Sequence, residues 1–528
     1  MKHFLRILYF ALALVMLMQA MVACTAQGGS TATDKKSDSK DPSDGEKDEA
    51  EPIVLQLTGK REVFWDDYLL DTENTTATHV LHQPTEAGVA ITHDLPWEGN
   101  ATDYHCIVQE PDGLLRMYYL GWNLSFSGGV RSTPINVCYA ESRDGIVWEK
   151  PELDIATWDG QKTNIIIDGR TSDAVNDGFF VFRDENPNCP AEELYKGLVR
   201  RDKANGSGQE LWCYTSADAI HFKKGWCMTD KGWFDSLNTV IWDAESETYI
   251  CYIRDFHGDE DKEKATRDVR YMYSSDFRTW SDPVQLDFMG KEDYPLYTNC
   301  ISQYQRASQI YVGFPTRYYD RGEWSRNYSR LCGAEARLKR YLLVKRYGTT
   351  ITDCVFMFSR DGEKWTRYDE AFMRPGPEYS DNWIYGDCYP ANGTLVETAG
   401  KHGTESEISL YSMIGVWSEK NPAQLMRYTI RKDGFVSLNA PYSGAKITTK
   451  QFVFGGEGIS INFSTSARGY VRITLTAEDG TVVKSEEIFG DSCDRIVDFD
   501  KKLSSLAGKK VVMEIEMRDA DIYSVKFD

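Results

Sequence analysis

The chain has little histidine and a deficit of positive charge. It contains 8 His, and its 81 acidic residues outnumber 60 basic ones, which gives a net charge of −21. Binding to phosphates needs a basic surface, so this charge argues against a nucleic-acid partner. The sequence also lacks a phosphate loop, a C-x-x-C pair and any Cys/His cluster with zinc spacing. We therefore expect no metal site, no cofactor and no histidine-based catalysis.

Long apolar runs are absent after the first two dozen residues, so no later segment is expected to span a bilayer. The one long run, ILYFALALVMLMQAMVA, follows the basic start MKHFLR, as in a secretory signal. Its end, MVAC, resembles a bacterial lipobox, in which Cys24 would be acylated and become the mature N-terminus. An ordinary signal peptide or a membrane anchor helix are the alternatives. We expect an exported bacterial lipoprotein, held on the periplasmic or outer face of a membrane.

Residues 25–52 have almost no large apolar side chain, which predicts a disordered polar linker that tethers the folded part to the lipid. Besides Cys24 there are eleven cysteines, and several of them lie in apolar segments such as ELWCYTS and YICYIRD. These are typical of small buried hydrophobic residues. No disulfide pairing follows from their spacing.

A short turn motif recurs along the chain. SRDGIVWEK, at 142–150, returns as SRDGEKWTR at 359–367, and the shared pattern is Ser-x-Asp followed four residues later by Trp or Phe. Each copy predicts a strand that ends at the Ser, a turn whose amides bind the Ser and Asp side chains, and an inward aromatic residue. The four copies are Ser142/Asp144/Trp148, Ser216/Asp218/Phe222, Ser274/Asp276/Trp280 and Ser359/Asp361/Trp365.

The repeated turns indicate a repeated four-stranded unit. Two strand-like segments precede each turn, and a fifth set (CYPANGTLVE, ISLYSMIG and LMRYTIRKDGF) keeps the strands without the motif. We predict an all-β protein with a five-bladed β-propeller at 53–440, because a β-sandwich of this length would not give in-register turns. After about residue 440, alternating strands with tight turns predict a C-terminal β-sandwich at 441–528.

NVCYAESRDGIVWEKPEL resembles the first-blade turn of the invertase, levanase and arabinanase superfamily, glycoside hydrolase families 32, 43, 62 and 68, in which S-x-D-L-x-x-W-x-x-x-P follows a G-H-A strand. The Asp box of sialidases places Ser and Trp one residue further apart. The predicted β-sandwich after the propeller strengthens the resemblance to family 32, whose members also carry one in this position. This resemblance covers roughly residues 55–528 and implies a glycosidase that acts on a fructan- or pentose-type glycan.

The resemblance also implies three carboxylates where the first strands of blades one to three begin. Blade-by-blade alignment places Asp103 at the nucleophile position, Asp177 at the stabiliser position and Asp235 near the acid/base position. The surrounding signatures differ, because no Pro-Asn-Gly follows Asp103, no Arg or Pro flanks Asp177, and the third position has Asp rather than Glu. Turn or strand-cap roles are the alternative for each residue.

Further residues are candidates for substrate binding. Aromatic rings can stack on sugar faces, and polar groups can bind hydroxyls, although core packing or a surface ion pair would also explain each one. The candidates are Trp97, Glu98, Trp122, Arg254, Trp383 and Asp387. We therefore expect a lipid-anchored glycoside hydrolase with an oligo- or polysaccharide substrate. A non-catalytic glycan-binding lipoprotein is the second hypothesis, and a sialidase-like enzyme is the third.

Overall fold

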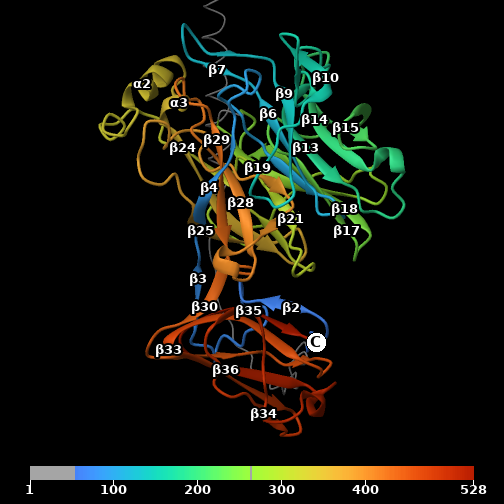
Figure 1. Ribbon diagram of the computed structural model, residues 1–528, viewed down its shortest axis with the longest axis vertical. Coiled ribbons are helices and arrows are strands. Elements are labelled where there is room, and N and C mark those ends of the chain that lie inside the picture. Colours follow the sequence, from blue (N-terminus) through green and yellow to red (C-terminus); the bar gives the residue numbers. More distant parts are fainter. Residues whose placement is uncertain (1–53, 262–263) are drawn as a thin grey trace, which may run out of the picture. The chain divides into compact units, whose positions relative to one another are not determined.

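The computed structural model describes residues 54–261 and 264–528, and these residues form an almost entirely β-stranded protein (Figure 1). Five sheets of four or five strands each follow one another along the chain, with their strands in meander order. The expected five-bladed propeller is therefore confirmed. The expected signal peptide, the lipidation site Cys24 and the polar linker lie outside the described residues.

The first three blades match the repeat read from the sequence, and each begins with its innermost strand. Blade one is formed by β5 (Cys106–Gln109), β6 (Leu115–Gly121), β9 (Asn136–Ser142) and β12 (Ile165–Ile167). Blade two is formed by β13 (Val175–Arg183), β14 (Tyr195–Asp202), β15 (Gln209–Ser216) and β16 (Lys223–Thr229). Blade three is formed by β17 (Thr239–Asp243), β18 (Thr248–His257), β19 (Thr266–Ser274) and β20 (Val284–Gln285).

The fourth blade is interrupted by an insertion. Its strands are β21 (Ile301–Gln303), β22 (Tyr311–Gly313), β23 (Thr316–Asp320), β24 (Thr350–Ser359) and β25 (Trp365–Met373). Strands β22 and β23 pair with successive parts of β24. The insertion between β23 and β24 carries the helices α2 (Ala334–Leu343) and α3 (Arg346–Thr349). None of the helices formed by the described residues has the length and apolar character that a bilayer crossing requires.

The fifth blade closes the ring with a strand from the other end of the chain. Three of its strands are β27 (Val396–Thr398), β28 (Glu407–Ile414) and β29 (Gln424–Ile430), and the outer one is β4 (Thr85–Thr92). Figure 1 shows β4, in blue, beside the orange β28 and β29. On the inner side, β26 (Asn392–Gly393) pairs in parallel with β5 of blade one. Both edges of the last blade are therefore joined to the start of the propeller.

The repeated turn joins each of blades one to four to the blade before it. In every copy the Ser and Asp oxygens accept backbone N–H groups, as expected. The residue three positions after the Ser is left-handed in all four copies, and its carbonyl accepts a hydrogen bond from an aromatic side chain of the preceding blade. The four pairs are Tyr411 Oη to Gly145 (2.5 Å), Tyr118 Oη to Ala219 (3.0 Å), Trp226 Nε1 to Phe277 (3.2 Å) and Tyr252 Oη to Gly362 (3.1 Å).

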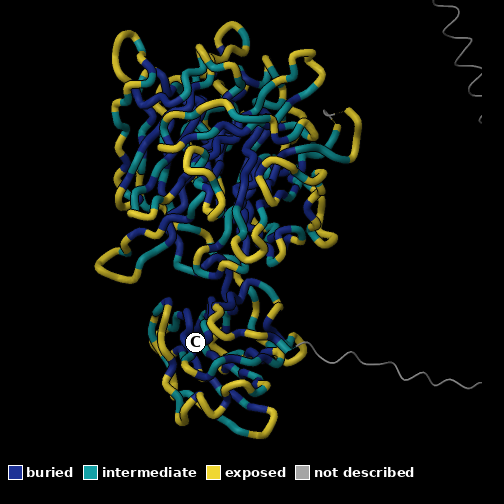
Figure 2. The backbone as a smooth tube through the Cα atoms, turned by 90° about the vertical axis from the view of Figure 1, so that its right-hand side faces the viewer, coloured by how far each residue is buried: buried dark blue, intermediate teal, exposed yellow. Residues whose placement is uncertain are grey.

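Minor hairpins and turns decorate the blades. They are the hairpin of β7 (Leu124–Ser125) and β8 (Arg131–Ser132), the hairpin of β10 (Leu153–Trp158) and β11 (Gln161–Thr163), and the short 3-10 helices at Ala191–Glu193 and Lys401–Gly403. Figure 2 shows buried segments in the interior of the propeller and exposed segments in its loops. The innermost strands β5, β13, β17, β21 and β26 contact one another in turn, so their first residues converge on one axis.

The C-terminal part is one hydrogen-bonded sheet of ten strands that folds over a single core. Its two long strands, β33 (Ile459–Ala477) and β36 (Val511–Phe527), pair in two stretches with a register break between Thr465 and Tyr470. Both halves contribute fully buried residues to the same core, in agreement with the expected sandwich. The shorter strands are β30 (Val436–Ala440), β31 (Ala445–Thr448), β32 (Phe452–Val453), β34 (Val482–Lys484) and β35 (Asp491–Ile496), with a 3-10 turn at Leu503–Leu506.

The N-terminal strands belong to this second sheet. They are β1 (Leu55–Gln56), β2 (Arg61–Val63) and β3 (Thr78–Leu81), which pair with β32, β36 and β30. The pairing thus differs from the expected division at 53–440 and 441–528, because residues 55–81 and 436–440 add strands to the C-terminal sheet. A sequence pattern does not show this, since each partner lies more than 300 residues away along the chain.

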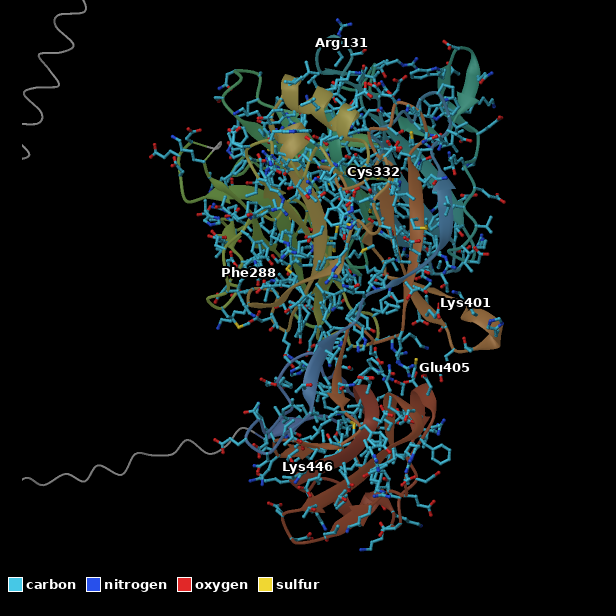
Figure 3. All side chains as sticks on the ribbon, turned by 90° about the vertical axis from the view of Figure 1, so that its left-hand side faces the viewer. Arg131, Phe288, Cys332, Lys401, Glu405 and Lys446 are labelled. Atoms are coloured by element: carbon cyan, nitrogen blue, oxygen red, sulfur yellow. The ribbon has the colours of Figure 1, made fainter. Side chains whose placement is uncertain are left out.

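A buried carboxylate binds the two parts together. Asp433, which is 0% exposed, accepts hydrogen bonds from Arg61 and Ser524 of the C-terminal sheet and from Tyr304 and Arg306 of blade four. These partners hold the pKa of Asp433 down at about 2 although its burial acts in the opposite direction. Glu405, labelled in Figure 3, adds a second link by accepting the backbone N–H of Cys493.

We predict that Gly362→Ala destabilises the protein by about 2–3 kcal/mol. Gly362 has φ +78°, and a Cβ would lie 2.9 Å from the Tyr252 hydroxyl, so the substitution combines backbone strain with damage to an inter-blade hydrogen bond. Gly376→Ala is the matched control, because Gly376 has φ +76° and open space around its Cβ position. Urea denaturation of both variants separates the two effects. Equal losses of stability would show that the inter-blade contact contributes nothing.

Candidate functional site

The three aspartates expected to be catalytic line one cavity. Asp103, Asp177 and Asp235 surround a space of about 290 Å³, although they are separated by 58 to 132 residues in the chain. All three side chains are half-buried. Each one stands just before or at the beginning of an innermost strand, β5, β13 or β17. The convergence of these strands on the axis thus brings the three carboxyl groups into one site.

Asp103 is held by the loop that leads into β5. Its carbonyl accepts the N–H of Leu120, and its carboxyl oxygen lies 3.5 Å from the indole Nε1 of Trp122. Gly99 lets this loop approach β6, since a Cβ there would lie 2.2 Å from the carbonyl oxygen of Trp122. The loop is therefore fixed against the end of β6, and it directs Asp103 into the cavity beside Trp122.

Asp177 and Asp235 are brought together by a glycine. Gly178 has φ +72°, and a Cβ at this position would lie 2.1 Å from the carbonyl oxygen of Ser236. Only glycine permits this approach, which places the backbone beside Asp177 against the backbone beside Asp235. The register break between Val175 and Phe180 in β13 marks the local departure from regular pairing.

The three carboxyl groups differ in their electrostatic surroundings. Burial and the neighbouring charge of Asp177 raise the pKa of Asp103 well above its usual range. Burial, and then Asp235, raise the pKa of Asp177 to about 6, although Arg200, Arg254 and Arg267 act against this rise. Asp235 forms an ion pair with Arg254, with Nη1 and Oδ1 2.8 Å apart. The cavity therefore combines a carboxyl group whose pKa is raised with one that is paired with an arginine, an asymmetry of the kind that acid–base chemistry requires.

The remaining wall is rich in aromatic side chains. Figure 3 labels Arg131, the first residue of β8, whose neighbours Val130 and Ser132 line the cavity. Six lining residues that the sequence did not indicate are Tyr104, Tyr297, Tyr347, Tyr385, Tyr389 and Trp417. Tyr297 and Tyr389 lie three or four residues before the innermost strands β21 and β26, as Asp235 and Asp103 do before β17 and β5, so the rule that found the aspartates would also have found them. Tyr347 comes from the insertion in blade four, and this rule could not have predicted it, because no innermost strand directly follows it.

Arg254 reaches the site through Asp235, and Trp122 lines the cavity itself. The other expected substrate-binding residues lie elsewhere among the described residues. Trp97 is buried and donates its indole N–H to Asn164 at 2.7 Å. Trp383 donates to the carbonyl of Gly376, at 2.9 Å. Neither indole lines the cavity.

The two carboxylates in the same group of candidates are also internal. Glu98 is 0% exposed and accepts hydrogen bonds from Tyr119 and Lys150, and its pKa is lowered to about 2 by His93 and Lys150 against the opposing effect of burial. Asp387 accepts the backbone N–H of Ile384, and burial raises its pKa to about 7. Both carboxylates bind their own loops, and the cavity wall does not include them.

No family model and no curated protein matches the chain. Among solved structures, an N-acetylgalactosamine deacetylase from F. plautii is similar over 66% of this chain and 96% of its own, with 12% identity and a TM-score of 0.43. A GH32 β-fructofuranosidase from Bombyx mori is similar over 84% and 94%, with 8% identity and a TM-score of 0.38. A sucrose-6-phosphate hydrolase from Lactobacillus gasseri covers 83% and 93%, with 10% identity and a TM-score of 0.38. At these values, the functional argument depends on the site itself.

We predict that Asp177→Asn stabilises the protein at pH 8 by about 1–3 kcal/mol and changes its stability little at pH 4. The folded state raises the pKa of Asp177 from 3.8 to about 6. The stabilising contribution of the protonated group is complete below pH 3.8 and is lost as the pH rises through 6, so the ionised carboxylate opposes folding at pH 8. An uncharged amide removes this effect.

Urea denaturation of both proteins at pH 4, 6 and 8 measures the difference. Asp154→Asn is the control, because the Asp154 side chain is 90% exposed. A gain in stability that does not vary with pH would contradict the proposed burial of charge at Asp177.

Proposed function

We propose that the protein is a glycoside hydrolase whose axial cavity cleaves a glycosidic bond. The observation that carries this proposal is the meeting of Asp103, Asp177 and Asp235 in one aromatic-lined cavity, in which their electrostatic surroundings differ. Glycoside hydrolysis needs one carboxyl group that protonates the leaving oxygen and one carboxylate that acts as nucleophile or base. The cavity offers both within a single space.

The electrostatics favour a particular division of roles. Asp103, whose pKa is raised, would donate a proton to the leaving oxygen, whereas Asp235, paired with Arg254, would act as the nucleophile or the general base. Asp177 interacts electrostatically with both: its charge raises the pKa of Asp103, and the charge of Asp235 raises the pKa of Asp177. This is the reverse of the roles that the resemblance suggested for Asp103 and Asp235. The surroundings decide the roles here, because carboxyl groups are chemically alike.

The lining supports a sugar as the ligand. Trp122, Tyr389 and Trp417 present rings on which the C–H face of a sugar can stack, and a cavity of about 290 Å³ is of the size of one sugar unit with its water. For the cleaved unit we propose a fructan- or pentose-type sugar, as the first-blade turn suggests. Non-catalytic glycan binding is the second candidate, because the aromatic lining would serve it equally well.

The proposed setting of this activity comes from the sequence. We propose that the chain is exported and lipid-anchored at Cys24, so that the propeller acts on glycans outside the cytoplasmic membrane. Labelling with a radioactive or clickable fatty acid, in the wild type and in a Cys24→Ala variant, tests this anchor. Label in the wild type alone supports it, and equal label in both proteins contradicts it.

We predict that Asp103→Asn, Asp177→Asn and Asp235→Asn each lower the rate of glycan hydrolysis by about 10²- to 10⁴-fold. Each substitution keeps the shape of the side chain and removes its acid–base chemistry. A screen of aryl glycosides and polysaccharides, with thermal melting to establish folding, measures the effect, and Asp154→Asn serves as the surface control. Glycan binding without turnover in the wild type would favour the second candidate and contradict the first.

We also predict that kcat/KM decreases as the pH is raised above about 6. The proton donor is part of the coupled pair Asp103–Asp177, and the pKa of Asp177 is about 6, so the pair loses its first proton in this region. Rates measured from pH 4 to pH 9 on one substrate give the profile. A rate that keeps increasing up to pH 9 would exclude a carboxyl group as the proton donor.

A further inference from the structure

The insertion in blade four carries two arginines that form no ion pair within the described residues. Arg346, at the start of α3, lines the aspartate cavity, and Arg340, on α2, lines an adjoining cavity of about 560 Å³. Neither guanidinium has an ion pair or a hydrogen bond within the described part of the chain. Arg340 is only 6% exposed, and its Nε is buried without a partner. A buried guanidinium without an ion pair is costly, and a ligand with negative charge would offset this cost.

A wall of aromatic rings separates the two arginines. Trp417 lines both cavities, and its ring centroid lies 5.8 Å from that of Phe126 and 5.5 Å from that of Tyr347. The Arg340 guanidinium lies 5.9 Å from the Phe126 centroid, and that of Arg346 lies 5.0 Å from the Tyr347 centroid. The rings hold one cation on each side of the wall and leave the hydrogen-bonding edges of both guanidinium groups without partners.

Nearby acidic groups have other partners. Glu419 forms an ion pair with Lys339 at 3.0 Å, and Asp381 accepts the hydroxyl of Ser418 at 3.1 Å. In the aspartate cavity, Asp235 pairs with Arg254. Burial and then Arg337 lower the pKa of Arg340 to about 10, which leaves it cationic at neutral pH. Asp381, Asp387 and Glu419 act on Arg340 through their charges, but no carboxylate of the described residues forms an ion pair with either arginine.

We propose that the substrate is an acidic glycan, in which the unit next to the cleaved sugar carries a carboxylate that Arg346 binds. A guanidinium matches a carboxylate through two parallel N–H···O hydrogen bonds, and stacking on a ring fixes its plane. Arg340, on the other side of the aromatic wall, binds a second acidic group that belongs to a more distant sugar unit of the glycan. The position of the cleaved unit in this arrangement depends on the proposed hydrolysis at the aspartates, whereas the recognition of a carboxylate does not.

Binding measurements test the proposal independently of turnover. The probes are oligosaccharides that contain galacturonate or glucuronate, their carboxyl-reduced counterparts, and a sulfated neutral oligosaccharide. We expect calorimetry at pH 7 to show that the wild type prefers a uronate form to its reduced counterpart by roughly 10-fold or more. Arg346→Gln is expected to weaken binding of the uronate form by roughly 10- to 100-fold and to leave binding of the reduced form unchanged.

Two further variants control the experiment. Arg346→Lys keeps the positive charge but lacks the paired N–H donors of a guanidinium, and it is expected to retain part of the preference for the uronate form. Arg330→Gln removes an exposed arginine of the same insertion, which lines neither cavity, and is expected to change nothing. Thermal melting identifies any variant that does not fold. Equal weakening of both probes by Arg346→Gln, or equal binding of both by the wild type, would overturn the proposal.

The sulfated probe and a hydrolysis assay separate the remaining outcomes. Binding of the sulfated probe as tight as that of the uronate form, and lost in Arg346→Gln, would overturn the assignment of a carboxylate. Hydrolysis of carboxyl-reduced and uronate substrates at equal rates would leave the proposed hydrolase intact and contradict the acidic specificity. A uronate preference that depends on Arg346, without hydrolysis of any substrate, would support the recognition and contradict the proposed hydrolase.

Discussion

A hydrogen bond between neighbouring blades determines where the blades meet. An aromatic side chain of one blade donates to the carbonyl of a left-handed residue in the next blade's turn, and Ser and Asp side chains hold that turn in shape. Because this contact is repeated, the innermost strands begin at the same level around the axis. The convergence of Asp103, Asp177 and Asp235 depends on that common level. The turn that is most visible in the sequence thus aligns the site without taking part in it.

The site illustrates how identical side chains acquire different chemistry. Three aspartates share one cavity, yet burial and a neighbouring charge raise the pKa of Asp103 while Arg254 pairs with Asp235. Gly178 makes this possible by allowing two backbones to touch, and it has no chemical role of its own. The aromatic wall and the insertion's arginines then add what the aspartates lack, namely stacking surfaces and positive charge. The strands supply the acid–base groups, and the insertion supplies groups suited to recognition.

Much of this was accessible from the sequence, and the remainder has physical reasons. The four turns predicted the blade register, and the register led to the three aspartates. It did not lead to β4, because TEAGVAIT carries no turn motif and its partner β29 lies more than 330 residues away. Glu98 and Asp387 precede inner strands as well, but local hydrogen bonds turn them inward. Arg346 and Tyr347 belong to an insertion outside the repeat, so no periodicity could place them.

The closure of the ring has a consequence for how the chain becomes folded during synthesis. Strand β4 is made early, yet it can pair only after β28 and β29 have been made, and β3 likewise waits for β30. Since domains fold as the chain emerges, residues 78–92 must remain unpaired while blades one to four form. Such a long-range closure is slow, and it leaves exposed strand edges in the meantime.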